Sequence, residues 1–154
     1  MGLFGFGKKK QESAQQQQLP PIMVAPWQMP PATKVYRLPA EHESNIYTYN
    51  GTPFKGVPAN TRFVVTAMPA EVRMESIYNG SASATVDRGD VAYAFNGQPF
   101  GFASSHAEAV RKLMQNGYIV EVEAYISGYD GELGFPKVRG LFGFVDDDLY
   151  KTLQ

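Results

Sequence analysis

The chain has 154 residues, of which 44% are apolar and 13% aromatic, and it carries a formal net charge of −1 and no cysteine. This length predicts one domain. The lack of cysteine excludes disulfides and thiolate metal sites, and no apolar run is long enough for a transmembrane helix. The ten Phe and nine Tyr favour strands, because flat side chains pack well on pleated surfaces.

The charge is unevenly distributed along the chain. Residues 1–34 carry four lysines against Glu12, a net charge of +3, which leaves ten bases and fourteen acids, a net charge of −4, for residues 35–154. A mildly acidic domain argues against broad electrostatic binding of duplex nucleic acid. The lysines at 8–10 precede a glutamine tract rather than an apolar segment, so no secretory signal is predicted and the expected location is cytoplasmic.

Residues 1–34 are predicted to be a disordered Gln/Pro-rich leader, because this composition buries too little apolar surface to offset chain entropy. Two segments in it leave alternatives open. Residues 3–7 (LFGFG) and the three lysines after them form either a solvated tail or a contact with an anionic membrane surface. Residues 22–29 (IMVAPWQM) either pack on the domain or dock on a partner.

The folded domain is predicted over residues 35–154. Residues 45–54 (NIYTYNGTPF) alternate and lead into Asn50-Gly51, a pair that favours a two-residue hairpin turn. Residues 61–68 form a strand that Pro69 ends, and residues 71–78 form another that Asn79-Gly80 turns. Residues 81–84 are predicted to be a loop of small residues or a weak edge strand.

A second hairpin signal lies at Asn96-Gly97, between a strand at 91–95 and a returning strand at 99–103. Gly101 in the returning strand predicts a bulge or a close approach of another backbone. The pattern aromatic-Asn-Gly-x-Pro-Phe occurs at both 49–54 and 95–100. This echo indicates that one turn is used twice.

The C-terminal third predicts a helix, two strands and a short helix. Ser104 or Ser105 is expected to cap a helix that begins at His106, with an apolar stripe at 110, 113 and 114 and a glycine stop at Gly117. Residues 118–127 alternate with period two, residues 135–145 form their partner strand, and Asp146 caps the last helix. The chain is therefore predicted to be mainly β (α+β): a small OB/SH3-like β-barrel with one principal α-helix and a short C-terminal helix.

No catalytic motif is found in the sequence. It contains no phosphate-binding glycine loop, no nucleophile elbow and no pair of histidines at metal-binding spacing. The three aspartates at 146–148 are explained by compensation of a helix dipole. We therefore expect a binding module rather than an enzyme, with no cofactor and no metal.

The aromatic residues suggest what such a module could bind. The tyrosines exceed what one small core needs, so some are expected on an exposed face or groove. Beside Arg62, Arg73 and Arg88 they would form a stacking platform for unpaired bases. The alternative is that they pack in the core and at sheet edges.

Residues 87–128 (DRGDVAYAFNGQPFGFASSHAEAVRKLMQNGYIVEVEAYISG) resemble the HIRAN domain family, small barrel-like domains found alone in bacteria or fused to chromatin-remodelling helicases. The positions that carry the resemblance are Asp87, Val91, Tyr93, Gly97, Gly101 and Phe102. The Asn-Pro-Tyr of the family reads Ala-Thr-Val at 84–86 here, and Phe63 is the candidate for one of the paired tyrosines of the first strand. The resemblance implies recognition of a single-stranded DNA 3′ end without catalysis.

These observations lead to two functional hypotheses. The first is a HIRAN-like module that binds single-stranded DNA through aromatic stacking and a few arginines. Its predicted nucleic-acid contacts are Arg62, Phe63, Arg88, Tyr93 and Phe102, with Asp87 shaping the loop. The second is a protein-interaction domain that binds a partner through residues 19–31. A membrane surface is one expected place for this interaction.

Overall fold

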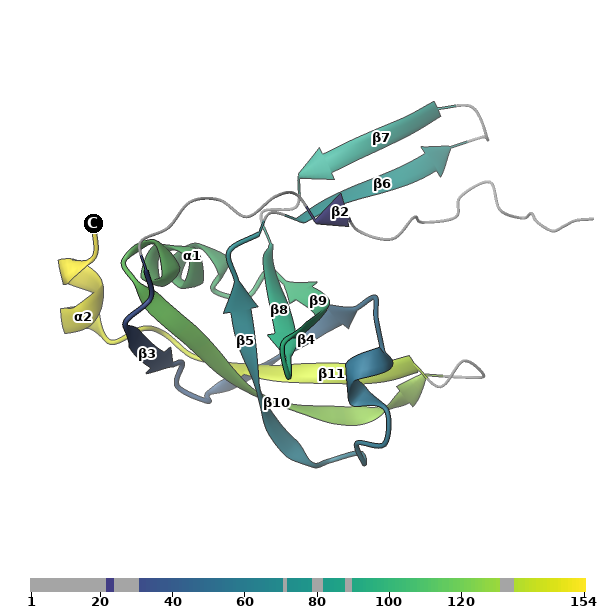
Figure 1. The fold of residues 1–154 in the computed structure, drawn as a ribbon, viewed down its shortest axis with the longest axis horizontal. Coiled ribbons are helices and arrows are strands. Elements are labelled where there is room, and N and C mark those ends of the chain that lie inside the picture. Colours follow the sequence, from purple (N-terminus) through teal and green to yellow (C-terminus); the bar gives the residue numbers. More distant parts are fainter. Residues whose placement is uncertain (1–21, 24–30, 71, 79–81, 88–89, 131–134) are drawn as a thin grey trace, which may run out of the picture.

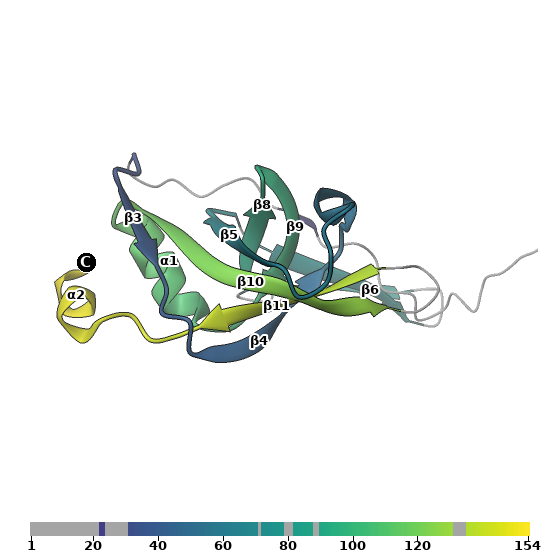
Figure 2. The same cartoon turned by 90° about the horizontal axis from the view of Figure 1, so that it is seen from below.

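The fold is described from a computed structural model (Figures 1 and 2). It describes residues 22–23, 31–70, 72–78, 82–87, 90–130 and 135–154, with side chains for 31–70, 90–129 and 135–154. The elements in chain order are β2 (Ile22–Met23), β3 (Lys34–Arg37), β4 (His42–Thr48), the 3-10 helix η2 (Thr52–Phe54), β5 (Arg62–Met68), β6 (Val72–Tyr78), β7 (Ala82–Asp87), β8 (Val91–Phe95), β9 (Gln98–Ala103), α1 (Ala107–Gln115), β10 (Tyr118–Asp130), β11 (Phe135–Phe142) and α2 (Asp147–Thr152).

Six antiparallel strands form a closed barrel. They pair in the order β11-β4-β9-β8-β5-β10, and the pairing of β10 with β11 closes the ring. The short strand β3 adds to β10 in parallel, and α1 packs across one end of the barrel (Figure 1). The predicted fold class, a mainly β barrel with one principal helix and a short C-terminal helix, is confirmed.

The long strand β10 connects most of the barrel. Its register places residues 121–125 against β5, residues 118–121 against β3 and residues 123–130 against β11. Because a strand has only two edges, β3 and β11 follow one another along the edge opposite β5. The predicted period-two pattern is confirmed, since Val120, Val122, Ala124 and Ile126 are fully buried and the residues between them are not.

The helix α1 covers the barrel with the predicted apolar stripe. Val110, Leu113 and Met114 are buried in the barrel core, and Gly117 ends the helix with φ 87°. The predicted serine cap is wrong. His106 occupies the N-cap position in the left-handed region (φ 50°) without a side-chain cap hydrogen bond, because Ser105 Oγ instead donates to Ser44 Oγ at 2.7 Å.

The two Asn-Gly pairs adopt different structures. Asn96 and Gly97 both have positive φ (51° and 79°), which confirms the predicted two-residue hairpin between β8 and β9. The hairpin predicted at Asn50-Gly51 is wrong. Gly51 has φ −83°, and Asn50 Oδ1 accepts a hydrogen bond from Thr52 N at 3.1 Å as the chain enters η2.

The difference follows from the contacts of Asn50 with β9, where its N–H donates to the carbonyl of Phe100 at 3.2 Å and its Nδ2 donates to that of Pro99 at 3.1 Å. The Phe54 ring is 1% exposed and lies edge-on to Phe100, with 4.7 Å between ring centroids. It also stacks on Phe95 at 5.0 Å. The last residues of the two echoed motifs therefore meet in one core, Phe100 from the returning strand β9 and Phe54 from η2.

Gly101 lies at the shortest strand pairing of the barrel, between β4 and β9. Only two residue pairs join β4 to β9, namely Tyr47 with Phe102 and Thr48 with Gly101. A Cβ on Gly101 would lie 2.2 Å from Tyr47 O, so the predicted close backbone approach is confirmed. A bulge adjoins it, where the carbonyl of Phe100 accepts hydrogen bonds from the N–H groups of Tyr49 and Asn50 at 2.9 and 3.2 Å.

A second, three-stranded sheet in the order β2-β6-β7 extends away from the barrel (Figure 1). Residues 82–87 form a strand at the edge of this sheet, paired with β6, so the edge-strand alternative predicted at 81–84 holds and the strand runs three residues further. Ile22 pairs with Arg73 and Met23 with Val72, so the leader segment joins its own domain at these two residues. Asn79-Gly80 and the rest of the predicted leader up to residue 30 lie outside the described residues.

The C-terminus follows the prediction closely. β11 ends at Phe142, three residues before the predicted limit. Asp146 Oδ2 then accepts a hydrogen bond from Leu149 N at 3.1 Å, which confirms the predicted cap of α2.

We expect Gly101→Ala to destabilise the protein by about 3 kcal/mol, because the new methyl group would push β4 away from β9 at their two paired positions. Urea unfolding followed by circular dichroism measures this. Gly128→Ala is the matched control, since a Cβ there meets nothing within 4 Å, and its effect should stay within about 0.5 kcal/mol. Equal stability of the two variants would contradict closure through Gly101.

Candidate functional site

Two of the predicted contact residues face the barrel interior. Tyr93 is completely buried, and its ring meets that of Phe142 at 6.2 Å. Phe63 is partly buried between the rings of Phe54 and Phe95, at 5.3 and 4.7 Å. In this structure the Tyr93 ring contributes to the core and offers no face to a base.

The other predicted residues are spread over the outside of the barrel and the second sheet. Arg62 is exposed on β5, where its Nη1 lies 2.6 Å from Glu123 Oε2 and its guanidinium lies over the Tyr125 ring at 5.4 Å. Phe102 is 3% exposed on β9, beneath Tyr47. Asp87 ends β7, and its side chain and Arg88 lie outside the described part. The four described side chains therefore do not form one surface.

A row of charged side chains does cross the outside of the barrel. Tyr125 donates a hydrogen bond from its hydroxyl to Glu43 Oε1 at 2.7 Å, and Arg139 Nε lies 3.6 Å from the same oxygen. The hydrogen bond to Glu43 raises the pKa of the Tyr125 hydroxyl. Since the pairs are exposed, each contributes little to stability, but together they fix where Arg139 lies.

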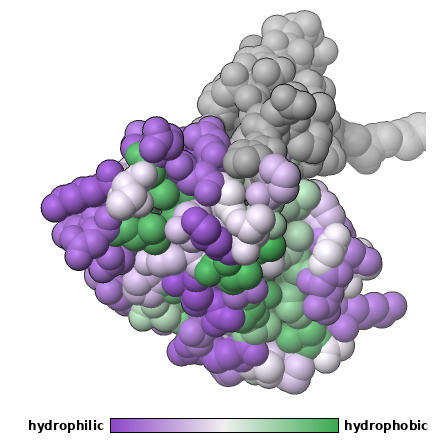
Figure 3. All heavy atoms as spheres, turned by 60° about the vertical axis from the view of Figure 1, so that its left-hand side comes forward, coloured by the Kyte–Doolittle hydropathy of each residue, from purple (hydrophilic) through white to green (hydrophobic). Residues whose placement is uncertain are grey.

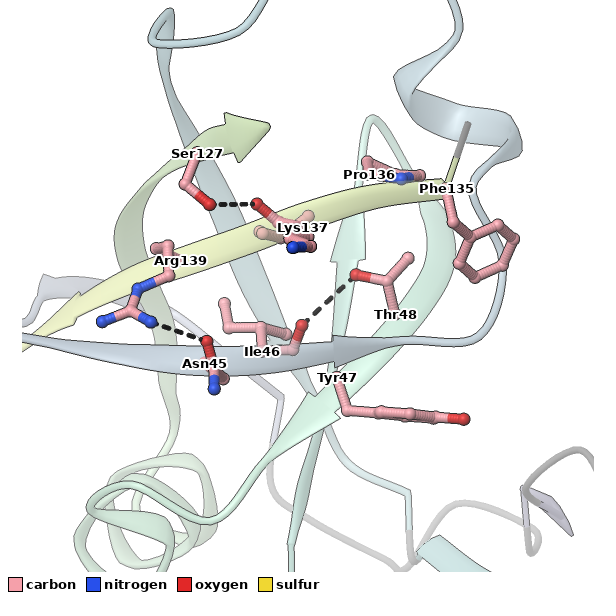
Figure 4. A pocket seen from close by; sticks show the side chains of 10 residues that line it. Asn45, Ile46, Tyr47, Thr48, Ser127, Phe135, Pro136, Lys137 and Arg139 are labelled. Atoms are coloured by element: carbon pink, nitrogen blue, oxygen red, sulfur yellow. Dashed lines mark hydrogen bonds between the residues drawn. The ribbon is translucent and has the colours of Figure 1, made fainter. Parts of the chain in front are cut away.

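Beside this row, two adjoining hollows form what we call the basic groove. One, of about 720 Å³, lies over β4 and β11 (Figure 4), and the other, of about 620 Å³, lies over η2 and the ends of β10 and β11. Phe135 and Pro136 line both, so the two hollows adjoin at these residues. The side chains that give the groove its chemistry are Tyr47, Lys55, Tyr129, Phe135, Lys137 and Arg139.

Three aromatic rings of the basic groove are open to solvent. Tyr47 is 49% exposed, Tyr129 is 44% exposed and Phe135 is 36% exposed. The Tyr47 ring rests on that of Phe102, with 5.0 Å between centroids, and the Tyr129 hydroxyl donates to the carbonyl of Val57. The Tyr47 and Tyr129 rings are therefore held in place before any ligand binds.

The charged side chains of the groove are all cations. Lys55 and Lys137 are exposed, and Arg139 Nη1 donates to Asn45 Oδ1 at 2.8 Å (Figure 4). No carboxylate lines either hollow among the described residues. Because Arg139 is also paired with Glu43 at 3.6 Å, the positive character of this groove comes chiefly from Lys55 and Lys137. It suits an anionic ligand with flat apolar parts, although the domain is acidic as a whole.

Part of this groove could be predicted from the sequence. Tyr47 and Tyr129 belong to the surplus of tyrosines that predicted an exposed aromatic face, and the structure confirms that they are exposed. Lys137 and Arg139 alternate with the buried residues Pro136 and Val138, which is a plain period-two pattern. Their closeness to Tyr47 depends on the pairing of β4 with β11, which the sequence did not predict.

In the described part of the chain, no group of three potential metal-binding side chains is found. No helix within those same residues has the length and apolar character needed to cross a bilayer. Of residues 19–31, the segment expected to dock a protein partner, the description covers only Ile22, Met23 and the last residue.

Comparison of the chain with protein-family models, curated proteins and solved structures finds no significant match. The function must therefore be argued from the geometry of the site.

The Tyr93 hydroxyl is buried without a hydrogen-bond partner, so we expect Tyr93→Phe to be neutral or to stabilise the fold by up to about 1 kcal/mol. Tyr36→Phe is the matched control. The Tyr36 hydroxyl accepts a hydrogen bond from Asp146 N at 3.1 Å, and its loss should cost about 1 kcal/mol. Thermal unfolding of both variants tests this, and a clear loss of stability in Tyr93→Phe would reveal a role for its hydroxyl.

Burial also raises the pKa of the Tyr93 hydroxyl. Above about pH 10 the unfolded chain releases this proton and the folded protein keeps it, so the free energy of unfolding should fall by about 1.4 kcal/mol per pH unit for this group. Tyr93→Phe should remove that part of the slope. Urea unfolding at pH 8, 10 and 11 measures it, and identical slopes for the variant and the native protein would contradict the prediction.

Proposed function

We propose that the protein is a non-catalytic module that binds single-stranded nucleic acid along the basic groove. The observation that carries this proposal is the combination of three exposed aromatic rings with three cations and no carboxylate in the described lining. Proteins bind single strands by stacking bases on aromatic side chains while cations follow the phosphates. A duplex would need a broader basic face than this acidic domain offers.

The positions of the side chains favour a strand that runs along β11. Phe135 and Lys137 are next-but-one neighbours on the outer face of β11, and Tyr47 lies on the adjoining strand β4 (Figure 4). Tyr47 is the strongest candidate for base stacking, because the Phe102 ring supports it from behind. We thus propose that Phe102, one of the predicted contact residues, supports the contact residue Tyr47.

The resemblance of residues 87–128 to the HIRAN family makes the proposed ligand more specific. It implies that the bound nucleic acid is single-stranded DNA and that the protein recognises its 3′ end. Of the residues that carry the resemblance, Tyr93 lies in the core and Phe102 lies under Tyr47. We therefore assign the contacts to the basic groove instead of to these positions.

We expect Tyr47→Leu to weaken binding of a fluorescein-labelled dT15 oligonucleotide by about 5- to 30-fold, since one stacked base contributes about 1–2 kcal/mol. Leucine keeps apolar cover over Phe102. Fluorescence anisotropy at 50 and 200 mM salt measures the affinity. If dT15 does not bind at micromolar protein, the proposal fails.

Lys137→Gln should weaken binding to every sequence alike and should lower the slope of log K against log salt by about one. Lys151→Gln, on α2, is the matched control because it changes the net charge equally outside the groove. Equal effects of the two variants would place the binding surface elsewhere. A circular single strand that binds as tightly as a linear one would exclude recognition of the 3′ end.

A further inference from the structure

A second groove lies on the other side of the molecule, between the start of α1 and the segment that leads into α2. It has a volume of about 570 Å³, and we call it the α1–α2 groove. Its apolar lining comes from Ala107, Ala109, Phe144, Val145 and Tyr150. Figure 3, which brings the α1 and α2 side of the molecule forward, shows apolar residues reaching the surface among hydrophilic ones.

Phe144 is the most unusual residue of this groove. It is 71% exposed, the highest value among the exposed large apolar side chains of the described residues. The His106 ring meets it edge-on at 4.8 Å and stacks on the buried Phe142 at 6.4 Å. Covering the exposed apolar surface of Phe144 would be favourable.

The charge of this groove is opposite to that of the basic groove. Glu108 and Asp147 line it, and no lysine or arginine does so among the described residues. Lys112 lies over the Tyr150 ring at 5.0 Å without belonging to the lining. The groove therefore suits a ligand that presents apolar side chains next to positive charge, and it does not suit a nucleic acid.

The chain itself contains a segment of this kind. Residues 3–10 read LFGFGKKK, with three large apolar side chains followed by three lysines. Twelve residue steps lead from residue 10 to residue 22, and they reach about 40 Å when extended. A domain of this size is roughly 35 Å across. Measured from Ile22, which pairs with β6, this linker is therefore about as long as the domain is wide.

We propose that residues 3–10 dock in the α1–α2 groove of their own molecule. Leu3, Phe4 and Phe6 would cover Phe144 and Val145, and the three lysines would lie beside Glu108 and Asp147. The basic groove would repel the same lysines, so the choice between the two grooves is electrostatic. The inference is independent of the proposed function, because it uses a different surface.

The test replaces Phe4 with the photocrosslinking residue p-benzoylphenylalanine in the full chain, followed by irradiation, trypsin digestion and mass spectrometry. Crosslinks are expected in the tryptic peptides 89–111 and 140–151, which contain the two walls of the groove. The same residue placed at Gln16 is the position control. Crosslinks that fall mainly on other peptides, or that mainly join two molecules, would overturn the proposal.

Two surface variants sharpen the test. Phe144→Ser should reduce the yield of these crosslinks at least fivefold, whereas Phe135→Ser, an exposed Phe of the basic groove, should leave it unchanged. Glu108→Gln combined with Asp147→Asn should reduce the yield and its sensitivity to salt. Equal yields in Phe144→Ser and Phe135→Ser would overturn the proposal.

A measurement without the crosslinker checks that the contact is not caused by the bulky p-benzoylphenylalanine side chain. In the full chain, Phe4→Ser with Phe6→Ser should shift the amide signals of residues 107–109 and 144–147 in nitrogen-15 NMR spectra. Signals of residues 45–48 should not move. Unchanged signals around Phe144 would show that the segment does not occupy the groove.

Discussion

Closure of the barrel depends on the contact between the backbones of β4 and β9. Only two residue pairs form this seam, and it exists because Gly101 has no side chain where the carbonyl of Tyr47 passes. The carbonyl of Phe100 in the adjoining bulge binds two backbone N–H groups of the β4–η2 connection. This seam directs Phe54 into the core and leaves Tyr47 outside, resting on Phe102.

The same seam connects the fold to the candidate site. Tyr47 precedes the residue that pairs with Gly101, so the tight approach fixes the ring that opens into the basic groove. On the other edge of β4, the register with β11 sets Asn45 opposite Arg139. The strand β4 therefore pairs with β9 along one edge, where Gly101 sets the constraint, and with β11 along the other, which places Asn45 beside Arg139. A binding surface built on paired strands is more rigid than one built on loops.

The two grooves are lined by side chains of opposite charge. The basic groove is lined by lysine and arginine, and the α1–α2 groove is lined by glutamate and aspartate, among the described residues. A net charge near zero for the whole chain hides this separation. Under the two proposals, the nucleic-acid ligand and the basic segment 3–10 would bind in separate grooves and would not compete.

The sequence by itself determined the features that depend on near neighbours. The alternation of β10, the stripe of α1, the turn at Asn96-Gly97 and the cap at Asp146 follow from local periodicity and backbone preference, and the structure has all of them. Tertiary structure decided what depends on distant partners. Asn50-Gly51 has the same local signal as Asn96-Gly97, yet Asn50 bonds to the distant strand β9, the chain enters η2 and the hairpin does not form. In the same way Tyr93 is buried and Tyr47 is exposed, because only the order of strands around the barrel determines which face of each strand lies inside.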